Sequence, residues 1–391
     1  MSKKMLKFLV LLLNFSLIFG QNAAISCRFS SQGTNYNCNL SINNPNGLNN
    51  FTQINGTHLE GRSDEDVVGV LPEAGSSSIN IPSIICSRFR NIRTVVLTNI
   101  GLQRVNRNSF NNCKMLSGLY LNDNRINFIE SGSFGENPEL LNLWIYSNEL
   151  TTLPENLFFN QSKLLDLDLT ENRIADLPAN IFRPLTNLQE LYLYANQITN
   201  IRPQWFDSLE NLQFLFLNEN QIEELPENAF KGLKNLEVFG LDDNNLKVIH
   251  SESFGIHPKL NVIYLMRNQI YAVDELLFNN TEMLNYLFFT GNVCADVDIN
   301  DALDNREHMM NILEPCFENY RNIGIETTTG TTSTTTEQTT TPACEAGNLD
   351  DRVCRIESEI EEFHGNFHNI NDELEDLRRQ IAELKISCSR S

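Results

Sequence analysis

The residues with the clearest reactive chemistry in this chain are its nine cysteines. In an oxidising compartment two thiols form a disulfide, whereas clustered thiols in the cytosol more often bind a metal or act in catalysis. The use of the cysteines therefore depends on where the chain resides, and the start of the sequence indicates the compartment.

A basic start with Lys3, Lys4 and Lys7 overlaps an apolar stretch over residues 6–19, and Gly20 is a small residue suited to cleavage. This pattern predicts a secretory signal peptide over residues 1–20, with a signal anchor as the alternative. The stretch is short for a membrane span, and no second apolar run of about 18 residues follows it. We therefore expect a secreted, extracellular protein without a membrane span, whose cysteines form disulfides.

Five Asn-x-Ser/Thr sequons fit export and are predicted N-glycosylation sites: Asn39, Asn50, Asn55, Asn160 and Asn279. The formal net charge of -21 argues against nucleic acid and anionic lipid as partners, because both require a basic surface. The same charge is compatible with a partner that has a basic surface.

The histidines give no support to an enzyme or a metal site. Four of them have no recognisable nucleophile or metal ligand as a neighbour in the sequence: His58, His250, His257 and His308. His364 and His368 have the i, i+4 spacing of a helical zinc pair but no third ligand, and we interpret them as solvated surface. We predict that the protein is not an enzyme and needs no metal or cofactor.

The elements that position these residues follow from a 24-residue period. Asparagine recurs at Asn124, Asn148, Asn172, Asn196, Asn220, Asn244, Asn268 and Asn292. Phenylalanine recurs at Phe110, Phe134, Phe158, Phe182, Phe206, Phe230, Phe254 and Phe278. Leucine recurs at Leu116, Leu140, Leu164, Leu188, Leu212, Leu236, Leu260 and Leu284, and one divergent turn with Ile92, Val95, Leu97 and Ile100 precedes them.

Within a turn the pattern is L-x-x-L-x-L-x-x-N-x-L, which is that of a leucine-rich repeat over roughly residues 85–295. It predicts a short strand in which Leu191 and Leu193 point inward and Tyr192 points outward. Because one turn cannot bury its apolar side alone, neighbouring turns must stack. We predict an α/β solenoid, a leucine-rich-repeat horseshoe over residues 92–293, in which the asparagines satisfy buried backbone and the phenylalanines fill the convex side.

Both ends of such a solenoid need covers, and the cysteines indicate where they lie. Residues 21–91 are predicted to form an N-terminal cap and residues 294–325 a C-terminal cap. Cys86 falls in the phenylalanine column one period before Phe110, and neighbouring coils stack about 5 Å apart, so we pair it with Cys113. The other expected disulfides join Cys27 with Cys38 and Cys294 with Cys316, and the alternative is that some of these thiols are free and buried.

Residues 326–343 are rich in threonine and predict a disordered, O-glycosylated type of linker. Residues 344–391 carry five heptads and predict an α-helical coiled coil, with a single amphipathic helix packed on the solenoid as the alternative. Its a positions are Val353, Ile360, Phe367, Leu374 and Ile381, and its d positions are Ile356, Phe363, Ile370, Leu377 and Leu384. The three cysteines left over are candidates for interchain disulfides in a homodimer or a heterodimer: Cys344, Cys354 and Cys388.

The outward positions of the strands line the predicted concave face, and aromatic and acidic residues gather there. The predicted binding residues are Tyr120, Trp144, Tyr146, Asp168, Tyr192, Tyr194, Phe216 and Tyr264. Exposed aromatic rings are good interface anchors, and the acids Asp166, Glu171, Glu190, Glu219, Asp242 and Asp243 run among them. This predicts a binding face for another protein with basic groups, and the alternative is that these residues only pack against one another.

Together, the signal peptide, the repeats, the cysteine caps and the cysteine-bearing coiled coil resemble the leucine-rich immune proteins of mosquitoes and related flies. In that family the coiled coil and hinge cysteines join two chains, and the complex binds complement-like thioester proteins against pathogens. The resemblance implies innate immune recognition by a disulfide-linked dimer that binds a complement-like partner. The family usually has a close cysteine pair between solenoid and coil, whereas Cys344 and Cys354 are ten residues apart here. The rival interpretation is an extracellular matrix or cell-adhesion protein.

Overall fold

The structure is a computed structural model that describes residues 25–32, 35–44, 53–300 and 302–326. The predicted signal peptide, the predicted coiled coil and all of the threonine-rich linker except Glu326 lie outside these residues. So do Asn50, the two histidines of the heptad region and the three cysteines that the sequence left unpaired.

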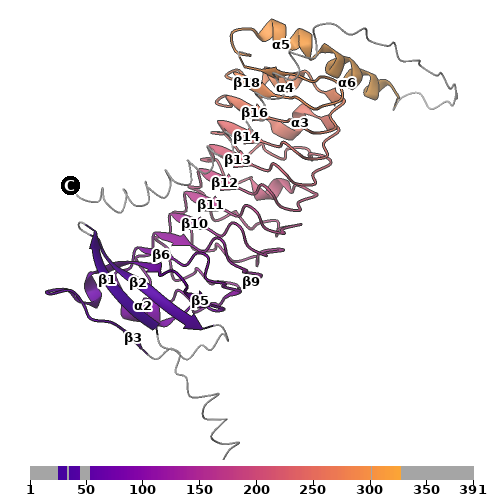
Figure 1. Ribbon diagram of the computed structural model, residues 1–391. Coiled ribbons are helices and arrows are strands. Elements are labelled where there is room, and N and C mark those ends of the chain that lie inside the picture. The colour runs from indigo at the N-terminus through magenta and orange to yellow at the C-terminus, as the bar shows by residue number, and fades with distance from the viewer. Residues whose placement is uncertain (1–24, 33–34, 45–52, 301, 327–391) are drawn as a thin grey trace, which may run out of the picture. The chain divides into compact units, whose positions relative to one another are not determined.

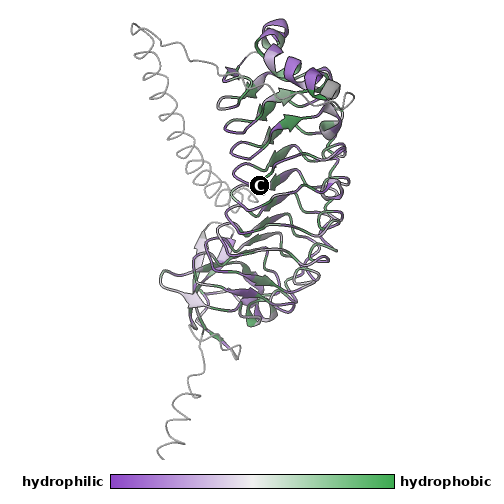
Figure 2. Ribbon diagram, turned by 90° about the vertical axis from the view of Figure 1, so that its right-hand side faces the viewer, coloured by the Kyte–Doolittle hydropathy of each residue, from purple (hydrophilic) through white to green (hydrophobic). Residues whose placement is uncertain are grey.

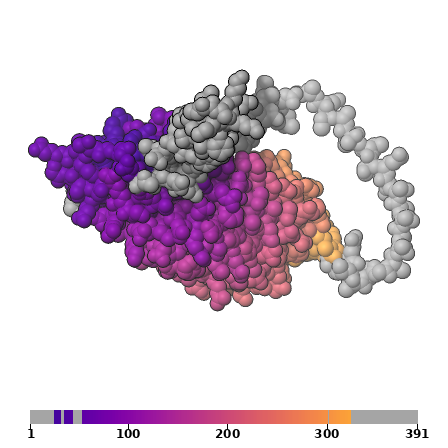
Figure 3. Space-filling view, turned by 90° about the horizontal axis from the view of Figure 1, so that it is seen from below, coloured from indigo at the N-terminus to yellow at the C-terminus, as the bar shows by residue number. Residues whose placement is uncertain are grey.

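One parallel sheet runs through the repeats, with one short strand from each turn (Figure 1). Its nine repeat strands are β6 (Thr94–Val96), β8 (Gly118–Tyr120), β10 (Asn142–Trp144), β11 (Asp166–Asp168), β12 (Glu190–Tyr192), β13 (Phe214–Phe216), β14 (Val238–Gly240), β16 (Val262–Tyr264) and β18 (Tyr286–Phe288). Each of these strands from β6 to β16 pairs in register with the strand 24 residues further on, as Leu143 does with Leu167. The repeats therefore form a β-solenoid of about nine turns, whose stacking order Figure 3 shows as a continuous change of surface colour.

The N-terminal cap extends the same sheet. Beyond β6 the strand order continues through β4 (Val67–Pro72), β2 (Asn35–Asn44), β1 (Ile25–Gln32) and β3 (Ile54–Asn55), and β5 (Ser77–Ser78) pairs with β2. The 3-10 helix η1 (Asp64–Asp66) precedes β4, and helix α2 (Ile84–Arg88) precedes β6. Fully buried Tyr36 and Phe89 lie inside the cap, which therefore covers the first turn with apolar side chains.

At the other end, β19 (Asp298–Ile299) pairs antiparallel with β18, and helices α5 (Arg306–Ile312) and α6 (Glu314–Glu326) follow. Helix α6 packs on β17 (Ala272–Val273), where Asn319 Nδ2 donates to the Tyr271 carbonyl oxygen at 2.7 Å. Strand β17 itself pairs with β15 (Val248–Ile249), and β7 (Arg104–Val105) pairs with β9 (Phe128–Ile129) nearer the other end. Among the helices of the described ranges, none is long and apolar enough to cross a membrane.

Three disulfides fasten the caps. Cys27 bonds to Cys38, Cys86 to Cys113 and Cys294 to Cys316, with Cα–Cα distances of 5.2, 4.8 and 5.0 Å. These are the pairs that the sequence predicted. The second joins α2 to the first full turn, and the third joins the segment after β18 to α6.

The core is the row of inward leucines and the column of phenylalanines, and Figure 2 shows mostly hydrophobic strands joined by mostly polar turns. The back of the solenoid, the side of the phenylalanine column, differs from the expected α/β form. Its described turns hold three short helical segments, η2 (Pro203–Trp205), α3 (Ser251–Phe254) and α4 (Leu276–Asn279). Elsewhere the back is closed by single i→i+3 hydrogen bonds, such as the one from the Leu157 N–H to the Pro154 carbonyl oxygen at 3.0 Å. These turns do not extend into helices, because the chain must return to the next strand.

The asparagine column forms a ladder of buried hydrogen bonds, as the sequence predicted. Asn196 Nδ2 donates to the carbonyl oxygens of Leu169, Leu193 and Tyr194 at 3.0–3.2 Å, and Asn196 Oδ1 accepts from the Ile174 N–H at 3.0 Å. The residue before each ladder asparagine is left-handed, as in Ala195 with φ 51°. The ladder thus holds each sharp turn out of the strand in place.

Candidate binding face

The strands present alternate side chains to the core and to solvent. In β10 the middle residue, Leu143, is fully buried, whereas Asn142 and Trp144 on either side are partly exposed. We call the outward positions of β8 to β18, together with the residue two beyond each strand, the sheet face. Its columns are Gly118, Asn142, Asp166, Glu190, Phe214, Val238, Val262 and Tyr286; Tyr120, Trp144, Asp168, Tyr192, Phe216, Gly240, Tyr264 and Phe288; and Asn122, Tyr146, Thr170, Tyr194, Asn218, Asp242, Met266 and Thr290.

All eight predicted binding residues lie on the sheet face. Six stand in its middle column, and Tyr146 and Tyr194 lie in the third. Register brings Trp144 beside Tyr120 and Asp168, and Tyr192 beside Asp168 and Phe216. Tyr264 is set apart from this run because Gly240 stands between it and Phe216.

The rings also pack against one another. Tyr120 and Trp144 meet edge to face at 4.7 Å, Tyr192 stacks on Phe216 at 5.5 Å and Tyr264 on Phe288 at 4.8 Å. Tyr192 is 9% exposed, which places it closer to a core residue than to a free anchor. The alternative that these rings pack among themselves therefore describes part of their role, and truncating them would lower stability as well as change the surface.

The carboxylates of the sheet face are held by neutral donors. Trp144 Nε1 donates to Asp166 Oδ2 at 2.7 Å, the Thr170 N–H donates to Asp168 Oδ1 at 2.9 Å, and the Tyr192 hydroxyl donates to Glu190 Oε2 at 2.7 Å. Burial and the Asp166 charge raise the pKa of the Tyr120 hydroxyl to about 12. No position in the three columns is Lys, Arg or His, so the face presents negative charge without cations of its own.

Asp242 is the most perturbed of these acids. It is 5% exposed, and burial raises the pKa of its carboxyl to about 7. The Met266 N–H at 2.7 Å and Asn218 Nδ2 at 2.8 Å donate to its two oxygens, and these bonds and the Arg267 charge oppose the rise. The sequence placed Asp242 among the acids of the face but gave no sign of this burial.

The sequence also missed a set of apolar residues in the first column of the sheet face. Phe214, Val238, Val262 and Tyr286 are paired in register along β13, β14, β16 and β18. All four are at least partly exposed, and Tyr286 is 37% exposed. The signal was present in the sequence, because these residues recur every 24 positions, one place before the inward apolar residue of each strand.

The structure shows the partners of one of the histidines. His58 Nε2 lies 2.8 Å from Asp64 Oδ1, and its Nδ1 lies 3.1 Å from the Tyr36 hydroxyl. Arg88 Nε also donates to Asp64 Oδ1 at 2.8 Å, and the His58 ring stacks on Phe29 at 4.0 Å. Within this network the Tyr36 hydroxyl also accepts a hydrogen bond from the Leu59 N–H. The network packs β3 and the following loop on the cap, so His58 has a structural role.

The other chemistry-bearing residues lie away from the sheet face. His257 is buried between the carbonyl oxygens of Leu233 and Phe254, and burial lowers its pKa, whereas His250 lies 2.9 Å from the Tyr320 hydroxyl. No group of three potential metal ligands occurs within the described ranges. The sequons at Asn55, Asn160 and Asn279 are exposed, while Asn39 is partly buried on β2 and donates to Ser30 Oγ at 3.0 Å.

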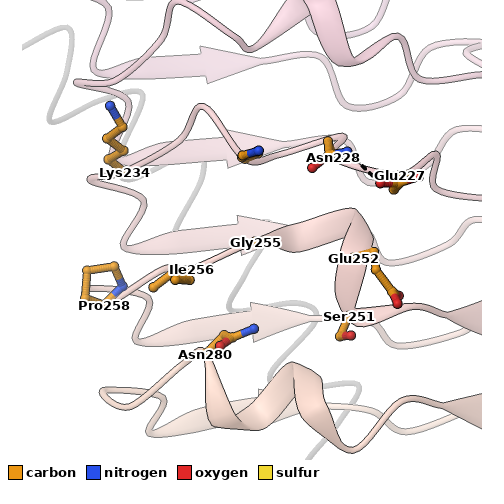
Figure 4. A pocket seen from close by; sticks show the side chains of 10 residues that line it. Glu227, Asn228, Lys234, Ser251, Glu252, Gly255, Ile256, Pro258 and Asn280 are labelled. Carbon is orange, nitrogen blue, oxygen red and sulfur yellow. Dashed lines mark hydrogen bonds between the residues drawn. The ribbon is translucent and has the colours of Figure 1, made fainter.

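A hollow of about 610 Å³ lies on the back of the solenoid near α3 (Figure 4). Its lining includes Glu227, Lys231, Glu252 and the exposed Ile256. Its charged side chains are of both signs, and the Ser251 hydroxyl is already bonded to Asp274. The hollow lacks the run of like charge and aromatic rings that distinguishes the sheet face.

The fold and the face define a β-solenoid with a long side-chain surface on its sheet. Family models for leucine-rich repeats match it: the model described as "Leucine rich repeat" matches residues 186–246 and 216–270, and "BspA type Leucine rich repeat region (6 copies)" matches residues 79–213. Together the two models for leucine-rich repeats match residues 79–270.

A solved structure similar to the chain is that of the Toll–Spatzle complex, a molecular hub in Drosophila development and innate immunity. The identity is 22% and the TM-score 0.47, over 57% of this chain and 33% of that one. The chain therefore spans about a third of the length of that protein. A comparison with curated proteins found no match.

Proposed function

We propose that this protein is secreted and binds another protein through the sheet face. The observation that carries the proposal is a run of aromatic rings and carboxylates along successive turns that includes no cation. Solenoids use such extended faces for binding, and the lack of matching charge within the face leaves it complementary to a basic surface. The three disulfides support an oxidising, extracellular location.

We further propose that the binding serves innate immune recognition, with a complement-like thioester protein as the partner. The support is the resemblance of the whole architecture to the leucine-rich immune proteins of mosquitoes and related flies. The sequons add to the proposal of export, since Asn55, Asn160 and Asn279 are exposed and lie outside the three columns of the face.

We expect a photoreactive amino acid at Asn142 or Val238 to cross-link the full-length secreted protein to its partner in extracellular fluid of the source organism. Both positions are partly exposed on the sheet face, and neither is one of the packed rings. The matched controls are Arg183 and Asn187, which are exposed and off the face. Mass spectrometry identifies the adducts. Cross-linking from the control positions alone would show that the partner binds elsewhere.

The secreted form is proposed to be a disulfide-linked dimer through residues 344–391. Nine cysteines minus the six in the three disulfides leave three, and Cys388 continues the a column of the heptads, where two parallel chains would face each other. We expect a non-reducing gel to show a band of about twice the monomer mass that Cys388→Ser weakens or removes. A monomer band throughout, with a monomeric mass in solution, would overturn the dimer.

A further inference from the structure

The sheet face changes its chemistry between β12 and β13. In the first column Asn142, Asp166 and Glu190 are followed by Phe214 and then by three more apolar residues. We call the residues Asp166, Asp168, Glu190, Trp144 and Thr170 the acidic sector, and the residues Phe214, Phe216, Val238, Val262, Tyr264, Tyr286 and Phe288 the apolar sector. The break falls at one point because Glu190 pairs directly with Phe214.

The acidic sector fits a cationic side chain. Asp166, Asp168 and Glu190 lie on two adjacent strands, with Asp166 paired to Glu190 in register. The Trp144 ring lies beside them, and an aromatic face next to carboxylates attracts an ammonium or guanidinium group. Thr170 is 2% exposed, and its hydroxyl has no hydrogen-bond partner within the described residues, so a polar acceptor remains unsatisfied in this sector.

The apolar sector fits large apolar side chains. Phe214, Val238, Val262 and Tyr286 form a continuous row across four strands, and the stacked pair of Tyr264 and Phe288 flanks its far end. The row is partly exposed throughout and reaches 37% at Tyr286. A contiguous exposed apolar surface of this kind marks an interaction site in a soluble protein.

We infer that the partner presents a basic residue and a large apolar group about 20 Å apart, the basic residue over β11 and the apolar group over β16. The separation is four strand spacings of about 4.8 Å, from β11 to β16. This inference rests on the proposed function and adds the chemistry and direction of the partner. The chain's own residues 344–391 carry more acidic than basic side chains, so their net charge has the same sign as that of the acidic sector and opposes docking there.

The test uses three fluorescent synthetic peptides and the full-length secreted protein. One peptide has two arginines separated by about six residues, or about 20 Å when extended, from a Leu-Phe pair. The second has the same composition with the arginines beside the Leu-Phe pair, and the third replaces the arginines with glutamine. We expect the spaced peptide to bind at least tenfold more tightly than the other two, because it alone reaches both sectors.

Two substitutions separate the sectors. Glu190→Gln keeps an oxygen for the Tyr192 hydroxyl but removes the charge, and should weaken the spaced peptide about fivefold without changing the weak binding of the glutamine peptide. Val262→Ser should weaken the binding of both the spaced peptide and the glutamine peptide. A benzophenone at the arginine end should cross-link to residues of β10–β12, and one at the Leu-Phe end to residues of β14–β18.

Equal affinity for the spaced and unspaced peptides, or cross-links in the reverse direction, would overturn the inference. Self-association that depends on concentration in sedimentation velocity, and that Glu190→Gln abolishes, would also overturn it. That result would mean that a second copy of this chain occupies the acidic sector. If the natural partner still cross-links from Asn142 and Val238 while the peptides fail, the sector inference fails alone. If the partner also fails to cross-link there, the proposed function fails.

Discussion

Replacing Asn196 with aspartate is expected to lower the free energy of unfolding by about 4 kcal/mol, although the two side chains have nearly the same size. Asn196 Nδ2 donates to three buried carbonyl oxygens, and a carboxylate has no hydrogen with which to do so. The three oxygens keep one other donor each, from Asn172, Asn220 and the Glu171 N–H, so the main cost is a negative charge buried against carbonyl oxygens without a compensating cation, about 3–5 kcal/mol. Asn196→Ala should cost a similar amount, because it also leaves the Ile174 N–H without its acceptor.

The matched control for the ladder is Asn187, which is exposed and donates once, to the Ser162 carbonyl at 2.8 Å. Asn187→Asp should change the free energy of unfolding by less than about 1 kcal/mol, because water replaces a lost surface bond. Denaturant unfolding of the full-length protein with its disulfides intact measures both. If Asn196→Asp unfolds at the same denaturant concentration as the original protein, the asparagine column does not hold the turns.

The second large effect is a loss of stability as pH rises, caused by Asp242. The pKa of this carboxyl is about 7 in the folded protein against 3.8 for the ordinary group, so the folded state binds the proton more tightly. The contribution of Asp242 to the free energy of unfolding is therefore largest below pH 3.8, and it declines as the pH rises to about 7. Between pH 5 and pH 8 the free energy of unfolding should fall by roughly 2–3 kcal/mol through Asp242 alone.

Asp242→Asn should remove this decline and should make the protein more stable than the original at pH 8. Asparagine occupies the same column at Asn122, so the position accepts the amide. Asp243→Asn is the control, because it removes the same charge one residue away, where the side chain pairs with Arg267 on the surface. The measurement is denaturant unfolding at pH 5 and pH 8. If Asp243→Asn removes the decline in the free energy of unfolding and Asp242→Asn retains it, the decline does not come from Asp242.

The same carboxyl links stability to binding. Asp242 lies on the sheet face two columns from Val238, and burial also raises the pKa of Tyr264, with the Asp242 charge as a further cause. A protonated Asp242 at pH 6 leaves the C-terminal half of the face nearly neutral, which favours apolar contacts there. The charges that remain are then those of the acidic sector.

The sequence predicted the repeat, the direction of its side chains and the pairing of Cys86 with Cys113 from the 24-residue period. A residue that recurs every 24 positions meets its own kind in the next turn, as in the ladder of Asn196, and Cys86, one period before Phe110, therefore lies beside the turn that holds Cys113. The period did not predict that the helical segments on the back of the solenoid are short, since helix length there depends on how soon each turn must reverse.

What the sequence determined by itself was therefore the solenoid, its ladder and which columns face solvent. The tertiary structure decided how each outward residue behaves, because that depends on side chains one turn away on either side. Tyr192 is a predicted anchor that stacks on Phe216 and is nearly buried, and Asp242 is a predicted surface acid that its neighbours shield from water. The period places a side chain on the face, but burial and pKa are set by packing between turns, and no single repeat contains that packing.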